Sequence, residues 1–447
     1  MRRIVCLIAV IPALAYADPK KLTLDEVMTK ALAGPKAQMA EGDREAAAAR
    51  VDEADAARLP RIKLTAFGTI SPKIDCDNPE CTETSPSNFA LRFDGFYGNA
   101  QLDITEPLYT FGKISHARAA ARAGVDAQSA LADEAAGDVA VDAARAYWGV
   151  KVARELGGML DDGIEEINKA LTDFEAKADT KKAGKPEISI QDRQRIAVLL
   201  AEAKAQRAEA QQAETQALAG LRALVGVADG DIDDTPLAAI DHELPASVSA
   251  DGRPQAKAAR AGAVAADELA KMEESQYWPD IALVASGVVS KAQGATDPPS
   301  AFAYDPYNRY GAGVVLGVQW TIEPWNVKAR ADRARAEAHK AHAQANLATL
   351  GARYDADSAI AEAKGAKDKV AAAGTGEKAA RAWLASVLQA QAIGVAESRD
   401  LADSYIAWFQ MRARWAAAVL QWNVGVVRLQ RATGEFKAGG PRPQGAK

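Results

Sequence analysis

Four segments of the chain alternate apolar and polar residues with a period of two. The alternation is most complete over residues 96–105 and 310–322, and it is weaker over residues 62–70 and 281–289. Such alternation predicts β-strands with one apolar and one polar face. Each segment has about the length that crosses a hydrocarbon core, so the apolar face suits lipid and the polar face suits water. Taken alone, the four strands fit a soluble sheet with one wet face equally well.

Between these strands, apolar residues recur three and four positions apart, which predicts helices. The pattern covers residues 112–176 and 188–225, and it returns over residues 327–391 and 400–434. At 1.5 Å per residue the first helix reaches roughly 100 Å. Alanine dominates these segments, and it is both the best helix former and small enough for close helix packing. We therefore expect long antiparallel helical hairpins.

The last of these helices carries a seven-residue apolar repeat in which only Arg412 is polar. Three tryptophans belong to the repeat, and a binding stripe is one interpretation of them. Packing in a helical core is the better interpretation, because a seam between helices needs apolar side chains at these positions. The apolar positions are Leu401, Tyr405, Trp408, Trp415, Val419, Trp422, Val426 and Leu429.

The same unit of strand, strand and long helix occurs twice. The pattern P-x-I-x-L-x-A-x-G occupies Pro60–Gly68 and again Pro279–Gly287. In each half a Glu-Pro pair follows, and we expect Pro107 and Pro324 to mark the change from strand to helix. The pattern indicates tandem repeats within one chain. The predicted boundaries are a signal peptide at 1–17, a first repeat at 18–240, a second repeat at 241–435 and a disordered tail at 436–447, with residues 227–250 linking the repeats in a belt around the helices.

The N-terminus has the features of a secretory signal. Arg2 and Arg3 precede an apolar run, and Ala15-Tyr16-Ala17 supplies a small-x-small cleavage site. Removing this leader takes away two positive charges, so the formal net charge moves from -6 to -8. A mildly acidic chain of this kind is a poor candidate for binding nucleic acid.

The three cysteines are informative because of their positions. Cys6 leaves with the leader, which leaves Cys76 and Cys81 in one polar loop. In an oxidising compartment we expect these two to form a disulfide, the alternative being two separate thiols. Since no cysteine follows the cleavage site, a lipid anchor at the mature N-terminus is not expected.

The number of strands has a consequence for assembly. Four strands cannot close a barrel, because about eight is the smallest number observed in membranes. An open sheet edge is not tolerated in lipid. If the strands cross a membrane, several chains must contribute to one barrel, and the protein is an obligate oligomer.

In order and duplication, the motifs resemble those of the TolC-like outer membrane efflux proteins, also called outer membrane factors. They comprise the opening Leu22–Val27, Leu59-Pro60 before the first strand, Glu106–Gly112 after the second, and the repeat ends at Gly226 and Gly434. The resemblance implies a mostly helical chain with a transmembrane β portion. Three chains would form a 12-stranded β-barrel in the outer membrane, continued by an α-helical barrel in the periplasm.

The resemblance also implies a function and partners. The chain would be the passive exit duct of a tripartite efflux or type I secretion system. A periplasmic adaptor and an inner membrane pump of the RND, ABC or MFS type would join it, and outer membrane lipid would surround the strands. The cargo, whether drugs, metals or a secreted protein, stays open at this point.

By the same resemblance, the periplasmic aperture falls at Asp400 and Asp403. Positions i and i+3 share a helix face, so three chains would present six carboxylates to one lumen. Such a ring attracts cations. The alternative is a pair of solvated carboxylates at a helix start, where the helix dipole favours them.

The hairpin tips carry the expected adaptor contacts. In the first repeat the tip is at Gln191 and Asp192, and in the second the turn glycine is Gly394. Because of two departures from the family pattern, the residues that hold the tip closed are not identified from the sequence. Gln391 and Ala396 stand where the family has a tyrosine and an arginine, and the first tip has an insertion at 179–186. Arg399 is adjacent, but we expect it on a different helix face from these two positions.

No enzyme, cofactor or metal site is indicated. His339 and His342 are three apart on a predicted helix, but no carboxylate or cysteine set completes a metal site. No phosphate-binding glycine loop is present in a suitable context. The alternative to a channel is a secreted periplasmic coiled-coil protein with a structural role, whose strands form a soluble sheet.

Overall fold

The computed structural model describes residues 21–76, 89–179, 190–245, 247, 249, 252–292, 308–393, 395 and 398–438 of the 447-residue chain. The leader, Cys81, Gly394, the insertion from residue 180 onward and the tail from residue 439 lie outside these ranges. The chain forms two compact units. The helical unit comprises Met1–Arg44, Gln128–Ala258 and Asn346–Lys447, and the sheet unit comprises Glu45–Ala127 and Ala259–Ala345.

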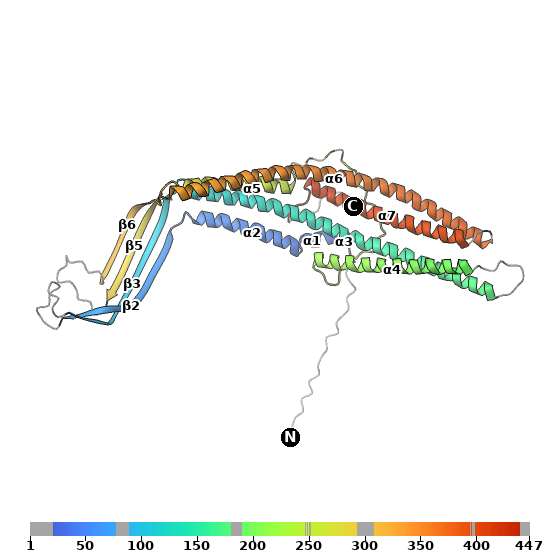
Figure 1. Cartoon of the computed structure of the whole chain (residues 1–447), viewed down its shortest axis with the longest axis horizontal. Coiled ribbons are helices and arrows are strands. Elements are labelled where there is room, and N and C mark those ends of the chain that lie inside the picture. Colours follow the sequence, from blue (N-terminus) through green and yellow to red (C-terminus); the bar gives the residue numbers. More distant parts are fainter. Residues whose placement is uncertain are drawn as a thin grey trace, which may run out of the picture. The chain divides into compact units, whose positions relative to one another are not determined.

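The sheet unit contains the four predicted strands in one sheet. They are β2 (Arg61–Cys76), β3 (Phe89–Tyr109), β5 (Asp280–Ala292) and β6 (Arg309–Gln319). The order in the sheet is β2-β3-β5-β6, and every neighbouring pair is antiparallel (Figure 1). The two repeats therefore share one sheet, since β3 of the first repeat pairs with β5 of the second.

The register brings the alternating apolar residues of all four strands to one face. Leu64 pairs with Leu102, Leu102 pairs with Gly287, and Ala285 pairs with Val314. Many of these side chains are exposed, which is unusual for residues of this size. The exposed apolar residues of this face include Ile62, Leu64, Ile70, Phe96, Leu102, Val289, Tyr310, Val314, Leu316 and Val318.

The two Glu-Pro pairs have different structures, and the expectation for Pro107 was wrong. Pro324 begins α6, where its missing N–H costs nothing. Pro107 instead lies inside β3, and the register with β5 shifts between Pro107 and Tyr109. The change to helix comes later, at Phe111 and Gly112, both of which have positive φ. Proline cannot donate a ladder hydrogen bond, so the strand becomes irregular at Pro107 and continues beyond it.

The four long helices lie where the sequence predicts them. They are α3 (Lys113–Asp179), α4 (Ile190–Val225), α6 (Pro324–Ala392) and α7 (Ser398–Thr433). Three shorter helices, α1 (Leu24–Leu32), α2 (Pro35–Ala56) and α5 (Pro254–Ser275), and two strands of two residues, β1 (Lys21–Leu22) and β4 (Asp231–Ile232), complete the described elements. In the described residues, no helix is both long and apolar enough to cross a membrane.

The predicted core role of the α7 repeat is confirmed. Val419, Trp422, Val426 and Leu429 are buried, and Trp408 and Trp415 are half-buried. The polar position, Arg412, is also part of the packing. Its guanidinium pairs with Glu155 of α3 and Glu377 of α6 and lies 4.4 Å from the Trp415 ring centre. The tryptophans therefore hold α7 in the helical unit.

Candidate functional site

The predicted aperture carboxylates lie in the first turns of α7. Asp400 and Asp403 are both exposed, and they share a face because they are three residues apart. The residues between and after them point the other way. Leu401, Ala402, Ser404 and Tyr405 are buried in the helical unit.

Arg399 is closer to this pair than the sequence indicates. Its Nε lies 3.7 Å from an Oδ of Asp403, four residues further along the helix. Residues four apart lie above one another on a helix, so Arg399 shares a face with Asp403. The expected difference in face between Arg399 and the positions of Gln391 and Ala396 stays a prediction. Both side chains are more than half exposed, so the pair is weak and readily broken. Each chain therefore presents Asp400 together with an Asp403 whose charge is partly offset.

A small apolar cluster fixes the orientation of this turn. Leu401, Tyr405 and Phe409 of α7 pack with α3, α4 and α6. Burial raises the pKa of the Tyr405 hydroxyl, and the nearby negative charge of Glu166 raises it further. The remaining members of the cluster are Met159, Leu160, Ala210, Leu384 and Val387, with Leu156 and Trp408 at its margin.

The other predicted tip residues are only partly described. Gln191 and Asp192 belong to the first turn of α4, but their side chains lie outside the described set, as does that of Gln391. Gly394 is outside it altogether. Exposed Ile393 and Val395 flank that glycine. The structure therefore places Asp400 and Asp403 in detail, and the roles of Gln191, Asp192 and Gly394 at the tips stay predictions.

The predicted disulfide falls outside the described residues. Cys76 is the last residue of β2, its side chain is not described, and Cys81 lies in the undescribed stretch that follows. The bond stays a prediction.

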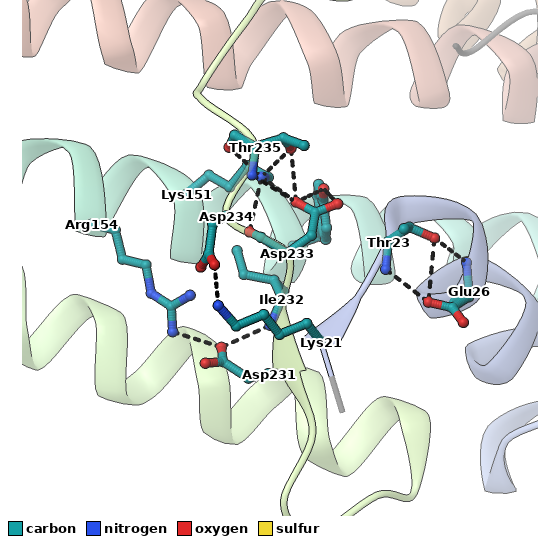
Figure 2. Close-up of polar contacts among 11 residues, drawn as sticks. Lys21, Thr23, Glu26, Lys151, Arg154, Asp231, Ile232, Asp233, Asp234 and Thr235 are labelled. Carbon is teal, nitrogen blue, oxygen red and sulfur yellow. Dashed lines mark hydrogen bonds and ion pairs between the residues drawn. The ribbon is translucent and has the colours of Figure 1, made fainter. Parts of the chain in front are cut away.

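The segment that links the two repeats, predicted above as a belt over residues 227–250, forms a network of buried polar contacts in the helical unit. The segment begins where β4 pairs in parallel with β1, Lys21 opposite Asp231 and Leu22 opposite Ile232 (Figure 2). Lys21 also pairs with Asp234. Thr23 then caps α1 in a capping box with Glu26, which fixes the start of that helix.

Lys151 of α3 binds the belt through an ion pair and hydrogen bonds. Its side chain is 3% exposed, and its ammonium lies 2.6 Å from Asp233 Oδ1, 2.6 Å from the Thr235 carbonyl and 2.7 Å from Thr235 Oγ1 (Figure 2). Burial pushes the pKa of Asp233 upward, but the hydrogen bonds from Lys151 and Thr235 bring it below its ordinary value. Burial, and then the charge of Asp233, raise the pKa of Tyr147. The belt is thus held by an ion pair that is largely removed from water.

A second anchor lies further along the belt. Asn423 of α7 is fully buried, and its side chain accepts from the Ile240 N–H and donates to the Ala238 carbonyl, both at 2.9 Å. The indole of Trp422 donates to the Ile240 carbonyl at 2.8 Å. Asn423 and Trp422 thus supply hydrogen-bond partners for the backbone groups of Ala238 and Ile240, which lie outside any strand of the structure. The signal available in the sequence was a lysine and an asparagine at core positions of apolar helices.

In the sheet unit, polar pairs connect neighbouring helices. Arg118 of α3 donates to Asp55 of α2 at 3.0 Å, and His116 of α3 lies 2.7 Å from Glu268 of α5. On its other side, α5 pairs with α6 through Glu274 and Arg335 at 2.7 Å. The helix order α2-α3-α5-α6 therefore repeats the strand order β2-β3-β5-β6.

The link between α3 and α5 is expected to weaken in acid. Hydrogen bonds from Lys271, and then from His116, lower the pKa of Glu268 from its ordinary 4.5. A carboxyl whose pKa is lower in the folded state stabilises the fold above its unfolded pKa and loses this effect as the pH falls through the folded value. Between about pH 5 and 3 the melting temperature should therefore fall more steeply in the wild type than in Glu268→Gln. The exposed Glu337→Gln is the control, and equal slopes in all three proteins would contradict the prediction.

A family model described as Outer membrane efflux protein matches residues 31–227 and 247–435. The chain belongs to the outer membrane efflux protein family. It is thus an outer membrane protein of the efflux channel type that extends into the periplasm, and the TolC-like resemblance is confirmed. The matched segments cover both repeats, and Asp400, Asp403, Gln191 and Asp192 all lie within them.

Solved structures show the same fold. The CmeC outer membrane channel of Campylobacter jejuni is 15% identical, with a TM-score of 0.77 over 93% of this chain and 87% of that one. The open-state MtrE outer membrane channel of Neisseria gonorrhoeae is 18% identical, with a TM-score of 0.73 over 92% and 88%. VceC, an outer membrane protein of Vibrio cholerae, is 17% identical, with a TM-score of 0.72 over 93% and 96%. A search of the curated proteins found no match. The predicted mostly helical fold with a four-stranded portion is confirmed.

Proposed function

We propose that three copies of this chain form one passive exit duct, with a 12-stranded barrel in the outer membrane and a helical barrel in the periplasm. The observation that carries the proposal is the four-stranded sheet. Among the described residues, its edge strands β2 and β6 each have a strand partner on one side only, and one face of the sheet exposes large apolar side chains. In lipid, unpaired edges must be closed, and three four-stranded sheets supply enough strands for a barrel.

Aromatic residues at the helix end of the sheet support a membrane boundary there. Phe111 stacks on Trp278 with ring centres 5.7 Å apart, and the Trp320 indole donates to the Tyr277 carbonyl at 3.2 Å. Trp325 is 83% exposed. Aromatic side chains of this kind gather where a barrel meets the interface between lipid and water.

The duct would work with an energised partner. A periplasmic adaptor would contact the hairpin tips near Gln191, Asp192 and Gly394, and an inner membrane pump of the RND, ABC or MFS type would supply the energy. The system would be a tripartite efflux or a type I secretion system. The Cys76–Cys81 disulfide would close the polar loop between β2 and β3. A secreted coiled-coil protein without channel activity is disfavoured by the family match and by the exposed apolar sheet face.

The aperture would lie at Asp400 and Asp403. Both carboxylates are exposed at the start of α7, and the buried cluster of Leu401, Tyr405 and Phe409 sets the direction in which they point. Threefold symmetry would assemble six carboxylates and three Arg399 guanidinium groups around one axis. Since the carboxylates outnumber the guanidinium groups, the ring would favour cations.

Single-channel recording in planar bilayers tests this proposal. The wild type should conduct cations in preference to anions, and Asp400→Asn with Asp403→Asn should bring the permeability ratio close to unity. Arg399→Ala should raise the preference for cations, because it removes the positive charge beside Asp403. The control, Glu202→Gln with Glu209→Gln, removes two exposed charges from α4 and should leave selectivity unchanged. Absence of conductance from a stable trimer would contradict the duct, and unchanged selectivity in the aspartate variant would contradict the aperture.

A further inference from the structure

The apolar face of the sheet contains a groove. Two hollows of about 470 and 500 Å³ lie on this face, and they adjoin each other because Ala100 and Val289 line both. We call the two hollows together the sheet groove. It forms because small residues stand at its floor on all four strands. They are Ala66, Gly68, Gly98, Ala100, Gly287 and Ala312.

Large apolar side chains form the walls of the sheet groove. Leu64 and Leu102 line its helix end, and both are exposed. Toward the loop end, a Cβ on Gly68 would lie 2.9 Å from the Phe96 ring, so the ring lies against this glycine. Tyr310, which is 90% exposed, lines the groove on β6. A concave surface with such a lining suits an apolar guest.

The length of the sheet groove matches one leaflet of a bilayer. The groove follows β3 from Gly98 to Leu102, which at about 3.4 Å per residue is about 14 Å. One leaflet occupies half of a hydrocarbon core that is roughly 30 Å thick. An acyl chain that lies along β3 therefore fits in the groove, whereas lipid elsewhere on this face meets protruding side chains.

Lys291 lies at the loop end of the sheet groove. It lines the same hollow as Gly98, its partner in the pairing of β5 with β3. Side chains alternate between the two faces of a strand, and Ser290 and Ala292 are buried whereas Lys291 is exposed, so Lys291 belongs to the apolar face. Within the part of the chain that the structure describes, its ammonium has no ion pair and no hydrogen bond. The charge of this lysine is therefore available to a ligand in the groove.

The place of Lys291 along β5 fits the level of lipid headgroups. A strand crosses a hydrocarbon core in about 9–11 residues, and Lys291 stands ten positions beyond Ile281 at the helix end of β5. A lysine on the lipid face is unfavourable among acyl chains and is tolerated where its ammonium reaches the headgroups. A lipid phosphate at this level would meet the ammonium at the end of a groove that takes an acyl chain.

We propose that the sheet groove binds one anionic, phosphate-bearing lipid per chain, with an acyl chain in the two hollows and the phosphate on Lys291. The lipid belongs to the leaflet at the loop end of the strands. The proposal rests on the barrel proposed above, because the closed barrel presents this face to lipid. It adds one lipid at a fixed place to the mobile lipid around the barrel. The unpaired ammonium selects a negative headgroup, and the apolar groove excludes a free anion.

Native mass spectrometry of the full-length protein in detergent tests the site. Phosphatidylglycerol and phosphatidylcholine with identical acyl chains are added in turn, and the lipids that the trimer retains are counted as the collision energy rises. The wild type should retain up to three phosphatidylglycerol molecules per trimer, several-fold more than phosphatidylcholine, because only phosphatidylglycerol has a net negative charge. An excess of inorganic phosphate should not displace it, since free phosphate has no acyl chain.

Substitution of the lysine tests the headgroup contact. Lys291→Gln should remove the preference for phosphatidylglycerol, and Lys291→Arg should keep it. The matched control is Lys340→Gln, which removes an exposed lysine of α6 outside the sheet and should change nothing. The trimer mass in each spectrum shows that the variant has assembled.

Filling the groove tests the acyl-chain contact. Gly287→Leu should reduce the retention of both lipids several-fold, because the new side chain occupies the floor. A Cβ at Gly287 has no neighbour closer than 4.0 Å, so the strand accommodates it. The control, Gly313→Leu, adds the same side chain to the opposite face of the sheet and should leave retention unchanged.

The possible failures separate the site from the duct. A wild-type trimer without preference for phosphatidylglycerol, or a Lys291→Gln trimer that keeps this preference, would overturn the lipid site and leave the duct standing. Displacement of the lipid by inorganic phosphate would also overturn it, because the groove would then bind a bare anion. A monomeric wild type would refute the trimeric duct itself.

Discussion

Replacing Lys151 by alanine is expected to lower the free energy of unfolding by about 3–5 kcal/mol, the usual cost of removing one partner of a buried ion pair. The change leaves Asp233 without its main counter-charge and the Thr235 carbonyl without its 2.6 Å donor. Because Asp233 is only 20% exposed, water cannot fully replace the lost ammonium. Urea unfolding of the detergent-purified protein, followed by circular dichroism, measures the effect.

An exposed pair in the same unit provides the control. Lys36 and Asp142 lie 2.9 Å apart, with side chains 54% and 37% exposed, so Lys36→Ala should cost less than about 1 kcal/mol. Lys151→Met with Asp233→Leu should recover much of the loss, because apolar residues tolerate burial without a partner. If Lys151→Ala and Lys36→Ala had similar effects, the belt would not depend on the buried ammonium.

Gly163→Ala is expected to destabilise the helical unit by about 1–3 kcal/mol, the range for forcing extra volume into a packed contact. A Cβ at this position of α3 would lie 2.2 Å from the Phe409 ring of α7, closer than any real contact. Alanine is ordinarily the better residue inside a helix, by about 1 kcal/mol, so the expected sign is opposite to the intrinsic preference. The missing side chain at Gly163 leaves room for the Phe409 ring, so α3 and α7 can approach each other closely at this point. Thermal unfolding of the purified protein measures the shift.

Gly158 offers a matched control on the same helix. A Cβ there meets nothing within 4 Å, so Gly158→Ala should stabilise the protein by about 0.5–1 kcal/mol. Phe409→Leu should rescue Gly163→Ala, because the shorter side chain leaves room for the new methyl group. If Gly163→Ala stabilised the protein as Gly158→Ala should, the prediction would be wrong, and the contact between α3 and α7 would have space for a methyl group.

The sequence was sufficient for the parts of the fold that depend on periodicity. Alternation in the segment containing Val314 predicted β6, and the seven-residue repeat through Val419 and Trp422 predicted the packed face of α7. In both cases the pattern repeats over many residues, so each residue adds to the same conclusion. The shared face of Asp400 and Asp403 followed from helix geometry alone. By contrast, Pro107 was wrongly predicted to mark the start of a helix. A prediction from one residue has no repeating pattern to support it.

What only the tertiary structure decided is which surfaces meet. The pairing of Lys21 with Asp231 joins two-residue strands that are too short to have a pattern. The core position of Lys151 on its helix does not show that its partner is Asp233 of the belt. The sequence does not distinguish Gly163 from the other helix glycines, because its close contact with the Phe409 ring arises only in the folded chain. Periodicity shows which face of an element is apolar, because that depends on neighbours in the chain. The partner of that face depends on contacts between residues far apart in sequence, which arise only when the chain is folded.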